Sequence, residues 1–307
     1  MIDLHTHSNF SDGDLSPASL MYEAVKHGLK AIALTDHDTI NGLDDAKKAA
    51  LSAGIRFIPG IELNIDWNSE KLPKGISGLG KGGEFHLLGL GINSPSEGFI
   101  TAIRELSRRR KARNYEILDK LHELSIIDEK PTAVWDELTA MSYVKDANGK
   151  PIHGKSLGRL HFARFLIKRK IVKNVKQAFA RYLSEGKPLY APKAGLPFDE
   201  AASLIRESGG IPVLAHPVSL YVAWGRLSDL VKTLKDMGLM GIEAWHPTAK
   251  PGFCRRLEAL AKSLELCITE GSDFHSYSHS EMTLGHSNRG RKINYTVLDS
   301  IKALAST

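Results

Sequence analysis

The sequence predicts an α/β protein in which seven strand–helix units form a barrel that an all-helical insert interrupts. Short apolar strand patterns alternate with amphipathic helix patterns over residues 1–97 and again over 196–307, which is typical of a parallel sheet. Residues 98–195 show helical periodicity alone. We therefore expect the two flanking segments to build one barrel and the insert to form a helical substrate cap.

The expected strands are short apolar runs that end at polar or turn-forming residues. The first is Asp3-Leu4-His5-Thr6-His7, and a Gly- and Lys-rich loop over about 68–83 precedes the fourth. We expect strands at 3–7, 30–35, 56–62, around His86, and at 211–215, 241–245 and 266–269.

The expected helices are bounded by capping residues and glycines. Ser16 and Pro17 open the first helix as an N-cap and a first-turn proline, and Gly28 ends it. The second helix, over about 41–53, ends at Gly54. The other barrel helices are expected near 198–208, 226–237 and 253–264, and those of the insert near 100–124, 132–142, 156–170 and 174–184.

Composition limits the class of protein. The 307 residues are ample for a buried core, and the net charge of +6 suits an anionic ligand such as a phosphate or nucleotide. Only two cysteines occur, Cys254 and Cys267, which excludes a disulfide framework and favours a reducing compartment. Because no signal-like apolar stretch and no run of membrane-spanning length is present, we expect a cytoplasmic protein without a membrane partner.

Metal-binding residue types recur where the predicted strands end. Parallel strands place their carboxyl ends at one mouth of a barrel, so these side chains are expected to converge. His5 and His7 share one face of the first strand because side chains alternate. Seven of the 13 histidines lie at strand ends, whereas a chance distribution would scatter them along the chain. With Asp12 from a turn, the set is His5, His7, Asp12, His37, Glu62, His86, His216, His246, Asp273 and His275.

The donor set indicates a multinuclear metal site. Carboxylates packed this closely repel one another unless cations lie between them. Imidazole and carboxylate ligands without cysteine suit zinc, manganese or iron. The ligands exceed what one ion needs, so we expect two to three divalent ions, with Glu62 able to bridge two of them. Such sites activate a water and clamp the attacking and leaving oxygens of a phosphoryl transfer.

Six ordered motifs make the chain resemble the polymerase and histidinol phosphatase (PHP) family. They are Asp3-Leu4-His5-Thr6-His7, Thr35-Asp36-His37-Asp38, Gly60-Ile61-Glu62, His86, Ala215-His216-Pro217 and Gly271-Ser272-Asp273-Phe274-His275. The resemblance covers about 1–97 and 196–307 and implies a distorted (βα)7 barrel.

Within that family, the chain resembles the phosphoesterases that act on nucleoside 3′,5′-bisphosphates and short RNA 5′ ends. Their helical insert carries a Gly-Arg-x-His element and a Gly-Lys-Pro element. Here these are Gly158-Arg159-Leu160-His161 and Gly186-Lys187-Pro188. The resemblance therefore implies a small nucleotide, or a short RNA, as the substrate.

The resemblance also implies a role for each site residue. Three ions would be held, respectively, by His5, His7, Glu62 and Asp273; by Glu62, His86 and His216; and by Asp12, His37 and His275. A metal-bridging hydroxide would be the nucleophile, and the catalytic residues would be His246, Asp273 and His216, with His246 contacting the phosphate or protonating the leaving oxygen. The residues expected to bind substrate are Arg159, His161, Lys187 and His246.

Two positions depart from the family pattern. Glu270 and Ser276 stand where glycine or another small residue is expected, which leaves substrate choice less defined than metal binding. We interpret Asp36 and Asp38 as turn or supporting residues rather than as ligands.

Three alternative functions stay open at this point. A histidinol-phosphate or other small phosphomonoester phosphatase of the same family is disfavoured by the helical insert. A metal-dependent amidohydrolase would need a metal-bridging lysine at a strand end, and none of the predicted strand ends carries one. A non-catalytic nucleotide-binding module would be expected to lose ligands, whereas this set is complete.

Overall fold

The computed structural model describes residues 1–66, 72, 83–142, 144–145, 151–152, 157–192, 195–277 and 282–299. The chain divides into two compact units. The barrel unit is Met1–Ile103 with Gly195–Thr307, and the helical unit is Arg104–Ala194. Most of the loop expected over 68–83 lies outside the described residues.

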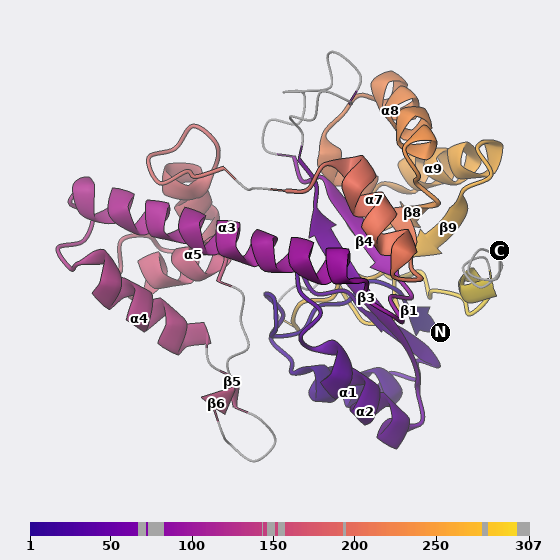
Figure 1. Ribbon diagram of the computed structural model, residues 1–307, viewed down its shortest axis with the longest axis horizontal. Coiled ribbons are helices and arrows are strands. Elements are labelled where there is room, and N and C mark those ends of the chain that lie inside the picture. The colour runs from indigo at the N-terminus through magenta and orange to yellow at the C-terminus, as the bar shows by residue number, and fades with distance from the viewer. Residues whose placement is uncertain are drawn as a thin grey trace. The chain divides into compact units, whose positions relative to one another are not determined.

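Seven strands of the barrel unit form one sheet (Figure 1), in the order β1 (Ile2–Asp3), β2 (Ala31–Leu34), β3 (Arg56–Asn64), β4 (His86–Leu90), β7 (Ile211–Leu214), β8 (Gly241–Trp245) and β9 (Cys267–Glu270). A parallel bridge between Thr6 and Phe274 joins the segments that follow the two edge strands. The backbone N–H of His7 donates to the Phe274 carbonyl at 2.9 Å. The sheet therefore nearly closes, which confirms the predicted α/β barrel.

The fourth strand differs from our prediction in its direction. β4 is antiparallel to β3, with His86 opposite Asn64, and antiparallel to β7. A parallel neighbour needs a crossover connection, usually a helix, and the Gly- and Lys-rich sequence before β4 has no helical apolar periodicity. His86 consequently opens its strand instead of ending it. It still reaches the edge of the sheet where β3 ends.

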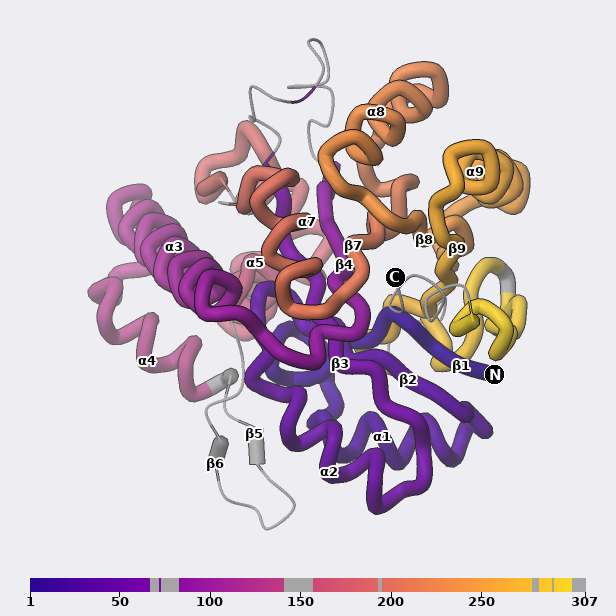
Figure 2. Tube along the Cα trace, turned by 45° about the vertical axis from the view of Figure 1, so that its right-hand side comes forward, coloured from indigo at the N-terminus to yellow at the C-terminus, as the bar shows by residue number. Residues whose placement is uncertain are grey.

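Five α-helices lie entirely within the described residues of the barrel unit, namely α1 (Pro17–Lys26), α2 (Leu43–Ala53), α7 (Phe198–Glu207), α8 (Trp224–Asp236) and α9 (Pro251–Ser263). The Ser16 hydroxyl caps α1 by accepting the Ser19 N–H at 3.1 Å, as predicted. Helices α1 and α2 lie side by side (Figures 1 and 2) and bury apolar side chains against β2.

Strand alternation separates the core from the site at the start of the chain. Ile2 and Leu4 are buried in an apolar cluster with Ala33 and Val213. The alternate positions carry Asp3, His5 and His7, all fully buried. The strand itself is shorter than the predicted 3–7, because β1 ends at Asp3 and the residues after it form only the Thr6 bridge. This extended segment contributes to packing on one face and to a polar cluster on the other.

The helical unit has its own apolar core, which includes Ile117, Leu121, Phe162 and Phe165. Its helices are α4 (Pro131–Ser142), α5 (Arg159–Lys168), α6 (Val175–Ala178) and a π-helix over Phe179–Leu183, together with most of α3 (Glu97–Glu123). One short antiparallel pair, β5 (Val144–Lys145) with β6 (Pro151–Ile152), departs from the all-helical expectation. The residues between its two strands lie outside the described part of the chain.

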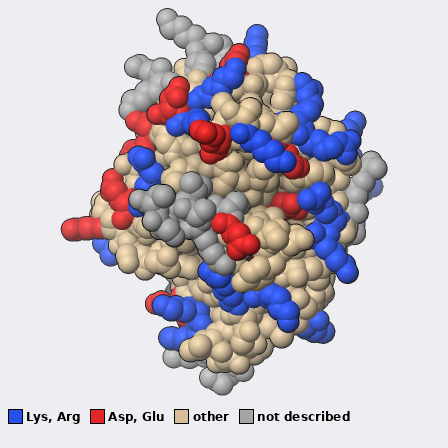
Figure 3. Space-filling view, turned by 90° about the vertical axis from the view of Figure 1, so that its right-hand side faces the viewer, with Lys and Arg blue, Asp and Glu red and all other residues tan. Residues whose placement is uncertain are grey.

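No helix in the described part of the chain is both long and apolar enough to cross a membrane. On the face drawn in Figure 3, Lys and Arg side chains gather in several groups, with Asp and Glu interspersed among them.

Candidate metal centre

The carboxylate of Glu62, near the end of β3, lies at the centre of the polar cluster and is fully buried. Its Oε1 lies 2.8 Å from both His86 Nδ1 and His216 Nε2. Its Oε2 lies 2.9 Å from His37 Nδ1, 3.3 Å from His7 Nε2 and 3.4 Å from His5 Nε2. One carboxylate therefore contacts five imidazoles that come from four different parts of the sheet.

His5, His7 and Asp273 form a tight group beside this carboxylate. The two Nε2 atoms of His5 and His7 are 3.1 Å apart. Asp273 Oδ1 lies 3.4 Å from His5 Nε2 and 3.2 Å from His7 Nε2. Two imidazole lone pairs can face each other at this distance only with a cation, a proton or a metal ion, between them.

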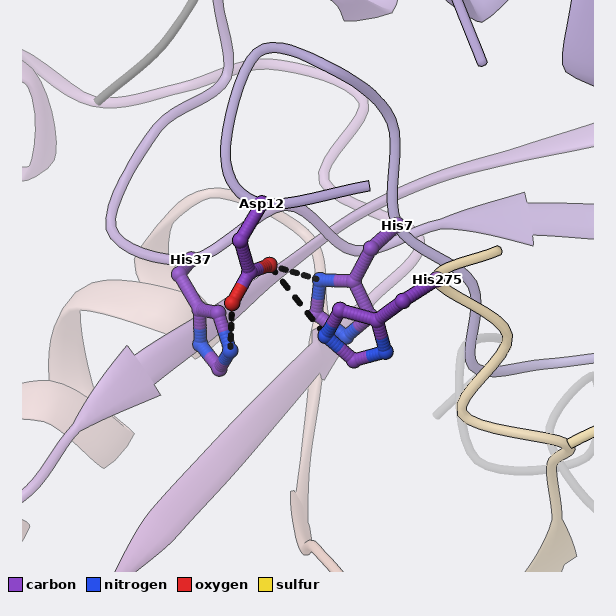
Figure 4. A group of neighbouring side chains, drawn as sticks. All are labelled: His7, Asp12, His37 and His275. Carbon is purple, nitrogen blue, oxygen red and sulfur yellow. Dashed lines mark ion pairs between the residues drawn. The ribbon is translucent and has the colours of Figure 1, made fainter. Parts of the chain in front are cut away.

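A second group surrounds Asp12 in the loop after the first strand (Figure 4). Asp12 Oδ1 lies 3.2 Å from His275 Nε2 and 4.0 Å from His7 Nδ1. Its Oδ2 lies 3.9 Å from His37 Nε2 on the opposite side. His7 belongs to both groups, so the two are continuous.

The residues fit divalent metal ions. Four overlapping sets have ligand atoms within 4.8 Å of one another: His7, Asp12, His37 and His275; His5, His7 and Asp273; His5, Glu62 and His216; and His37, Glu62 and His86. Two buried oxygens, Glu62 Oε2 and Asp12 Oδ1, accept no well-aligned hydrogen bond from the described residues. Each of these oxygens faces imidazole nitrogens, and a bound cation would be a further partner for it.

Residues 3–187 match the PHP domain family. A 5′-3′ exoribonuclease from Haemophilus influenzae is 32% identical over 273 residues, which is 89% of each chain. The chain belongs to the PHP domain family.

Two further comparisons agree with this assignment. A 3′,5′-nucleoside bisphosphate phosphatase from Chromobacterium violaceum is 27% identical over 286 residues, 93% of this chain and 90% of that one. A crystal structure from Bifidobacterium adolescentis, provisionally assigned as a metal-dependent phosphoesterase, shares the fold with a TM-score of 0.78 at 24% identity, over 98% of this chain and 95% of the other. This PHP protein is a metal-dependent phosphoester hydrolase.

Charge pairing dominates the titration of the PHP centre. Burial, the largest influence, works against ionisation of Glu62, yet the charges of His37 and His86 hold its pKa well below the usual range. Burial likewise lowers the pKa of His275, but the carboxylates of Asp12 and Asp273 outweigh it and raise that pKa to about 10. Without metal, His275 therefore holds a proton that a metal ion would displace.

Glu243, in the middle of β8, supports two ligands and was missed by sequence analysis. Its Oε1 lies 3.0 Å from His5 Nδ1, and its Oε2 accepts the backbone N–H of His216 at 2.7 Å. A carboxylate behind a ligating imidazole fixes the tautomer and the orientation of the ring. The available signal was an ionisable residue inside a strand whose five residues are all buried.

Asp36 supports the loop that carries Asp12. Its carboxylate accepts the backbone N–H of Ser8 at 2.7 Å and the hydroxyls of Ser8 and Ser11, each at 2.6 Å. These bonds fold the loop back on itself just before Asp12.

Asp38 supports His86 through Asn64, a second residue that sequence analysis missed. Asp38 accepts the Asn64 backbone N–H at 2.9 Å and its side-chain amide at 2.6 Å. Asn64 Oδ1 then lies 3.0 Å from His86 Nε2, which leaves Nδ1 of that ring to face Glu62.

Two of the site residues have backbone conformations that L-residues rarely adopt. His216 has a φ of 24° and Asp273 a φ of 52°. Such strain persists where the surroundings over-determine a conformation, and it clusters at functional sites. For Asp273 the surroundings include Asp3, whose carboxylate accepts the N–H groups of Ser272 at 3.0 Å and Gly285 at 2.8 Å.

His246 lies beside the metal-ligand cluster and is 3% exposed. Its Nε2 is 3.3 Å from Asp273 Oδ2, and its Nδ1 is 2.9 Å from the Thr248 hydroxyl. The structure thus brings His246 together with all nine predicted metal ligands.

The predicted substrate residues of the insert lie in the helical unit. Arg159 is the first residue of α5, and its guanidinium lies 5.8 Å from the centre of the Phe179 ring. His161 is buried, and its Nδ1 accepts the backbone N–H of Gly158 at 3.1 Å. Lys187 is exposed in the turn after the π-helix. Their roles toward substrate stay predictions.

Of the two residues that depart from the family pattern, the structure explains one, Glu270. Glu270 accepts hydrogen bonds from Arg291 Nη2 at 3.0 Å and from the Ser287 hydroxyl at 3.1 Å. It therefore fastens the segment after β9 to the barrel. Ser276 is 4% exposed, and nothing in the structure explains its choice over a smaller residue.

Proposed function

We propose that this phosphoesterase hydrolyses a phosphate ester of a small nucleotide, of the nucleoside 3′,5′-bisphosphate type, or of a short RNA at its 5′ end. The observation that carries the proposal is the placement of Glu62, whose two oxygens face five imidazoles in one buried cluster. Multinuclear sites of this kind suit phosphoryl transfer. The nucleotide class is supported by relatives named for such substrates along about nine-tenths of the chain.

We further propose two to three divalent ions, of manganese, zinc or iron. The ligands would be His5, His7, Glu62 and Asp273 for one ion, Glu62, His86 and His216 for a second, and Asp12, His37 and His275 for a third. When bound, such ions supply positive charge for the phosphoryl oxygens and lower the pKa of a coordinated water. The two buried free cysteines fit a reducing, cytoplasmic setting.

The chain's own catalytic residues would be His246, Asp273 and His216. The Thr248 hydroxyl fixes the His246 ring through Nδ1. His246 Nε2, the nitrogen that faces Asp273, would then contact the phosphate or give a proton to the leaving oxygen. His216 is held from both sides, by the Ser219 hydroxyl at 2.6 Å and by Glu62 at 2.8 Å.

Arg159, His161 and Lys187 would bind the phosphate that does not react. The Arg159 guanidinium can form two parallel hydrogen bonds to a phosphate, and Lys187 adds a point charge. Because His161 Nδ1 accepts the Gly158 N–H, its neutral ring carries the proton on Nε2. That N–H is a donor suited to a phosphate oxygen.

A comparison of four substrates tests this function. We would measure kcat/KM with manganese for a nucleoside 3′,5′-bisphosphate, a short 5′-phosphorylated RNA, histidinol phosphate and p-nitrophenyl phosphate. We expect the nucleotide substrates to exceed the two simple phosphomonoesters. A preference for histidinol phosphate would replace the nucleotide assignment with the histidinol phosphatase alternative.

A further inference from the structure

The positive charge of the chain is concentrated in the helical unit. Residues Arg104–Ala194 contain 21 Lys and Arg against 10 Asp and Glu, whereas the rest of the chain contains 20 against 25. The overall charge of +6 therefore combines a strongly basic helical unit with an acidic barrel unit. Sign asymmetry of this kind between two parts of one chain indicates a polyanionic partner for the basic part.

One row of these cations follows a single face of α3. Arg104, Arg108 and Lys111 are spaced four and three residues apart, so their side chains are neighbours on the helix, and all three are exposed. We name these three residues the basic stripe. At 1.5 Å per residue, the stripe extends about 10 Å along the helix axis, which is longer than one phosphate group.

The basic stripe continues into a pair of stacked aromatic rings. Tyr115 is the next residue on the same face of α3, and its ring stacks on Trp135 of α4 with centroids 4.7 Å apart and an angle of 19°. Lys111 Nζ lies 5.7 Å from the centre of the Trp135 ring. Both rings are only partly buried. This face of α3 thus presents a row of cations followed by an aromatic platform.

A purely solvating role does not account for this arrangement. Solvated helix faces alternate charge signs, whereas the sequence between Arg104 and Tyr115 contains a single acid, Glu105. Glu105 bonds to Arg108 at 2.7 Å and to Arg109 at 2.8 Å. Exposed ion pairs of this type add little stability, so a phosphate can take the place of Glu105.

We propose that the basic stripe and the Tyr115–Trp135 stack bind a single-stranded RNA chain. Proteins that hold single strands combine cations that follow the phosphates with aromatic rings on which bases stack. The inference rests on the proposed function, since it assigns the chain beyond the reacting end of an RNA substrate to this surface. A nucleoside bisphosphate has too few phosphates to span the stripe.

The test is equilibrium binding of a labelled twelve-nucleotide oligouridylate with phosphorothioate linkages, which resist hydrolysis, to the metal-loaded enzyme at several salt concentrations. The variant is Arg104→Gln/Arg108→Gln/Lys111→Gln. The matched control removes the same charge from exposed lysines of the barrel unit, as Lys47→Gln/Lys48→Gln/Lys232→Gln. Each phosphate contact contributes about −0.7 to the slope of log K against log salt for single strands.

We expect the stripe variant to lower the magnitude of this slope by about 2, while the control leaves it unchanged. For wild type, these three contacts alone predict that a fourfold rise in salt concentration lowers the affinity for the oligonucleotide about twentyfold. Trp135→Leu should weaken binding without changing the slope, because stacking releases no counterions. Equal slopes for the stripe variant and the control would overturn the proposal, and so would equal affinity for inorganic polyphosphate, which has no bases to stack.

Turnover of the nucleoside bisphosphate separates this proposal from the proposed function. If wild type hydrolyses neither this compound nor a short 5′-phosphorylated RNA but binds the oligonucleotide through the stripe, the proposed function is wrong and the binding surface stands. If wild type hydrolyses it but the stripe variant binds the oligonucleotide normally, the binding surface is wrong and the proposed function stands.

Discussion

Glu243 Oε1 lies 3.0 Å from Nδ1 of His5, and the other oxygen of the same carboxylate accepts the backbone N–H of His216 at 2.7 Å. One buried side chain on β8 therefore orients two predicted metal ligands that lie 211 residues apart in the sequence. His5 is left to present Nε2 toward Glu62 and Asp273. Glu243 is a positioning residue, since none of its contacts is to a reacting atom.

Glu243→Gln should lower metal affinity about 10- to 100-fold, which is the usual effect of losing a hydrogen-bonding partner behind a ligand. The amide cannot stabilise the orientation of His5 as the carboxylate does, although it keeps nearly the same shape. Calorimetric titration of the metal-free protein with manganese measures the effect. The control is Glu265→Gln at an exposed position, and equal affinities for the two variants would contradict the positioning role.

Local periodicity was sufficient to predict part of the site. His5 and His7 lie two residues apart, on either side of the bridged Thr6 just after β1, so the alternation of an extended chain puts their rings on one side. The structure has their Nε2 atoms 3.1 Å apart. The capped helix after Ser16 and the order of the strands were predicted in the same way.

The features that could not be predicted depend on long-range contacts. Glu243 meets His5 across 238 residues, and no local pattern encodes that contact. The direction of β4 depends on how the chain returns after Asn64, so His86 was assigned to the wrong end of its strand while its meeting with Glu62 was foreseen. Asn64 was not predicted as a site residue, because an amide on a strand does not indicate a site until its partners Asp38 and His86 are known.

Removing divalent metal should abolish phosphoesterase activity. The four overlapping ligand sets exceed the needs of one ion, so metal analysis of the active enzyme should find two to three ions per chain. Dialysis against a chelator, followed by activity assays with each metal added back, provides the measurement. A fully active sample with only trace metal would contradict the multinuclear site.

His5→Ala and Asp273→Ala should each lower turnover by several orders of magnitude. Each change removes a donor from the group in which the two Nε2 atoms and Asp273 Oδ1 meet within 3.4 Å, and with it the bound charge that stabilises the transition state. When the metal is removed from all three proteins, the thermal unfolding midpoint of each variant should be close to that of wild type. Near-normal turnover of either variant would be incompatible with these ligand assignments.

Both cysteines should resist thiol reagents in the folded protein. Burial raises the pKa of the Cys267 thiol from 9.0 to about 12, and it raises that of Cys254 as well. Because only the thiolate reacts, a rise of about three pH units lowers the reactive fraction about 1000-fold at pH 8. A colorimetric thiol assay should detect no rapid reaction in the native state and two thiols per chain after denaturation. Rapid native labelling would show that α9, which carries Cys254, or β9, which carries Cys267, is not packed as described.

Arg159→Ala should lower kcat/KM for a substrate with two phosphates far more than kcat/KM for an aryl phosphate. If Arg159 binds the phosphate that does not react, losing a charge-assisted hydrogen bond costs about 1.5–3 kcal/mol, or about 10- to 100-fold in kcat/KM. The matched control is Arg181→Ala, since Arg181 also lies over an aromatic ring, 5.4 Å from the centre of Tyr182. Measured on a nucleoside 3′,5′-bisphosphate and on p-nitrophenyl phosphate, the control should behave as wild type on both. An equal loss on both substrates for Arg159→Ala would place this residue at the reacting phosphate or in the fold of the helical unit, and the bisphosphate assignment would then lose its principal support from the insert.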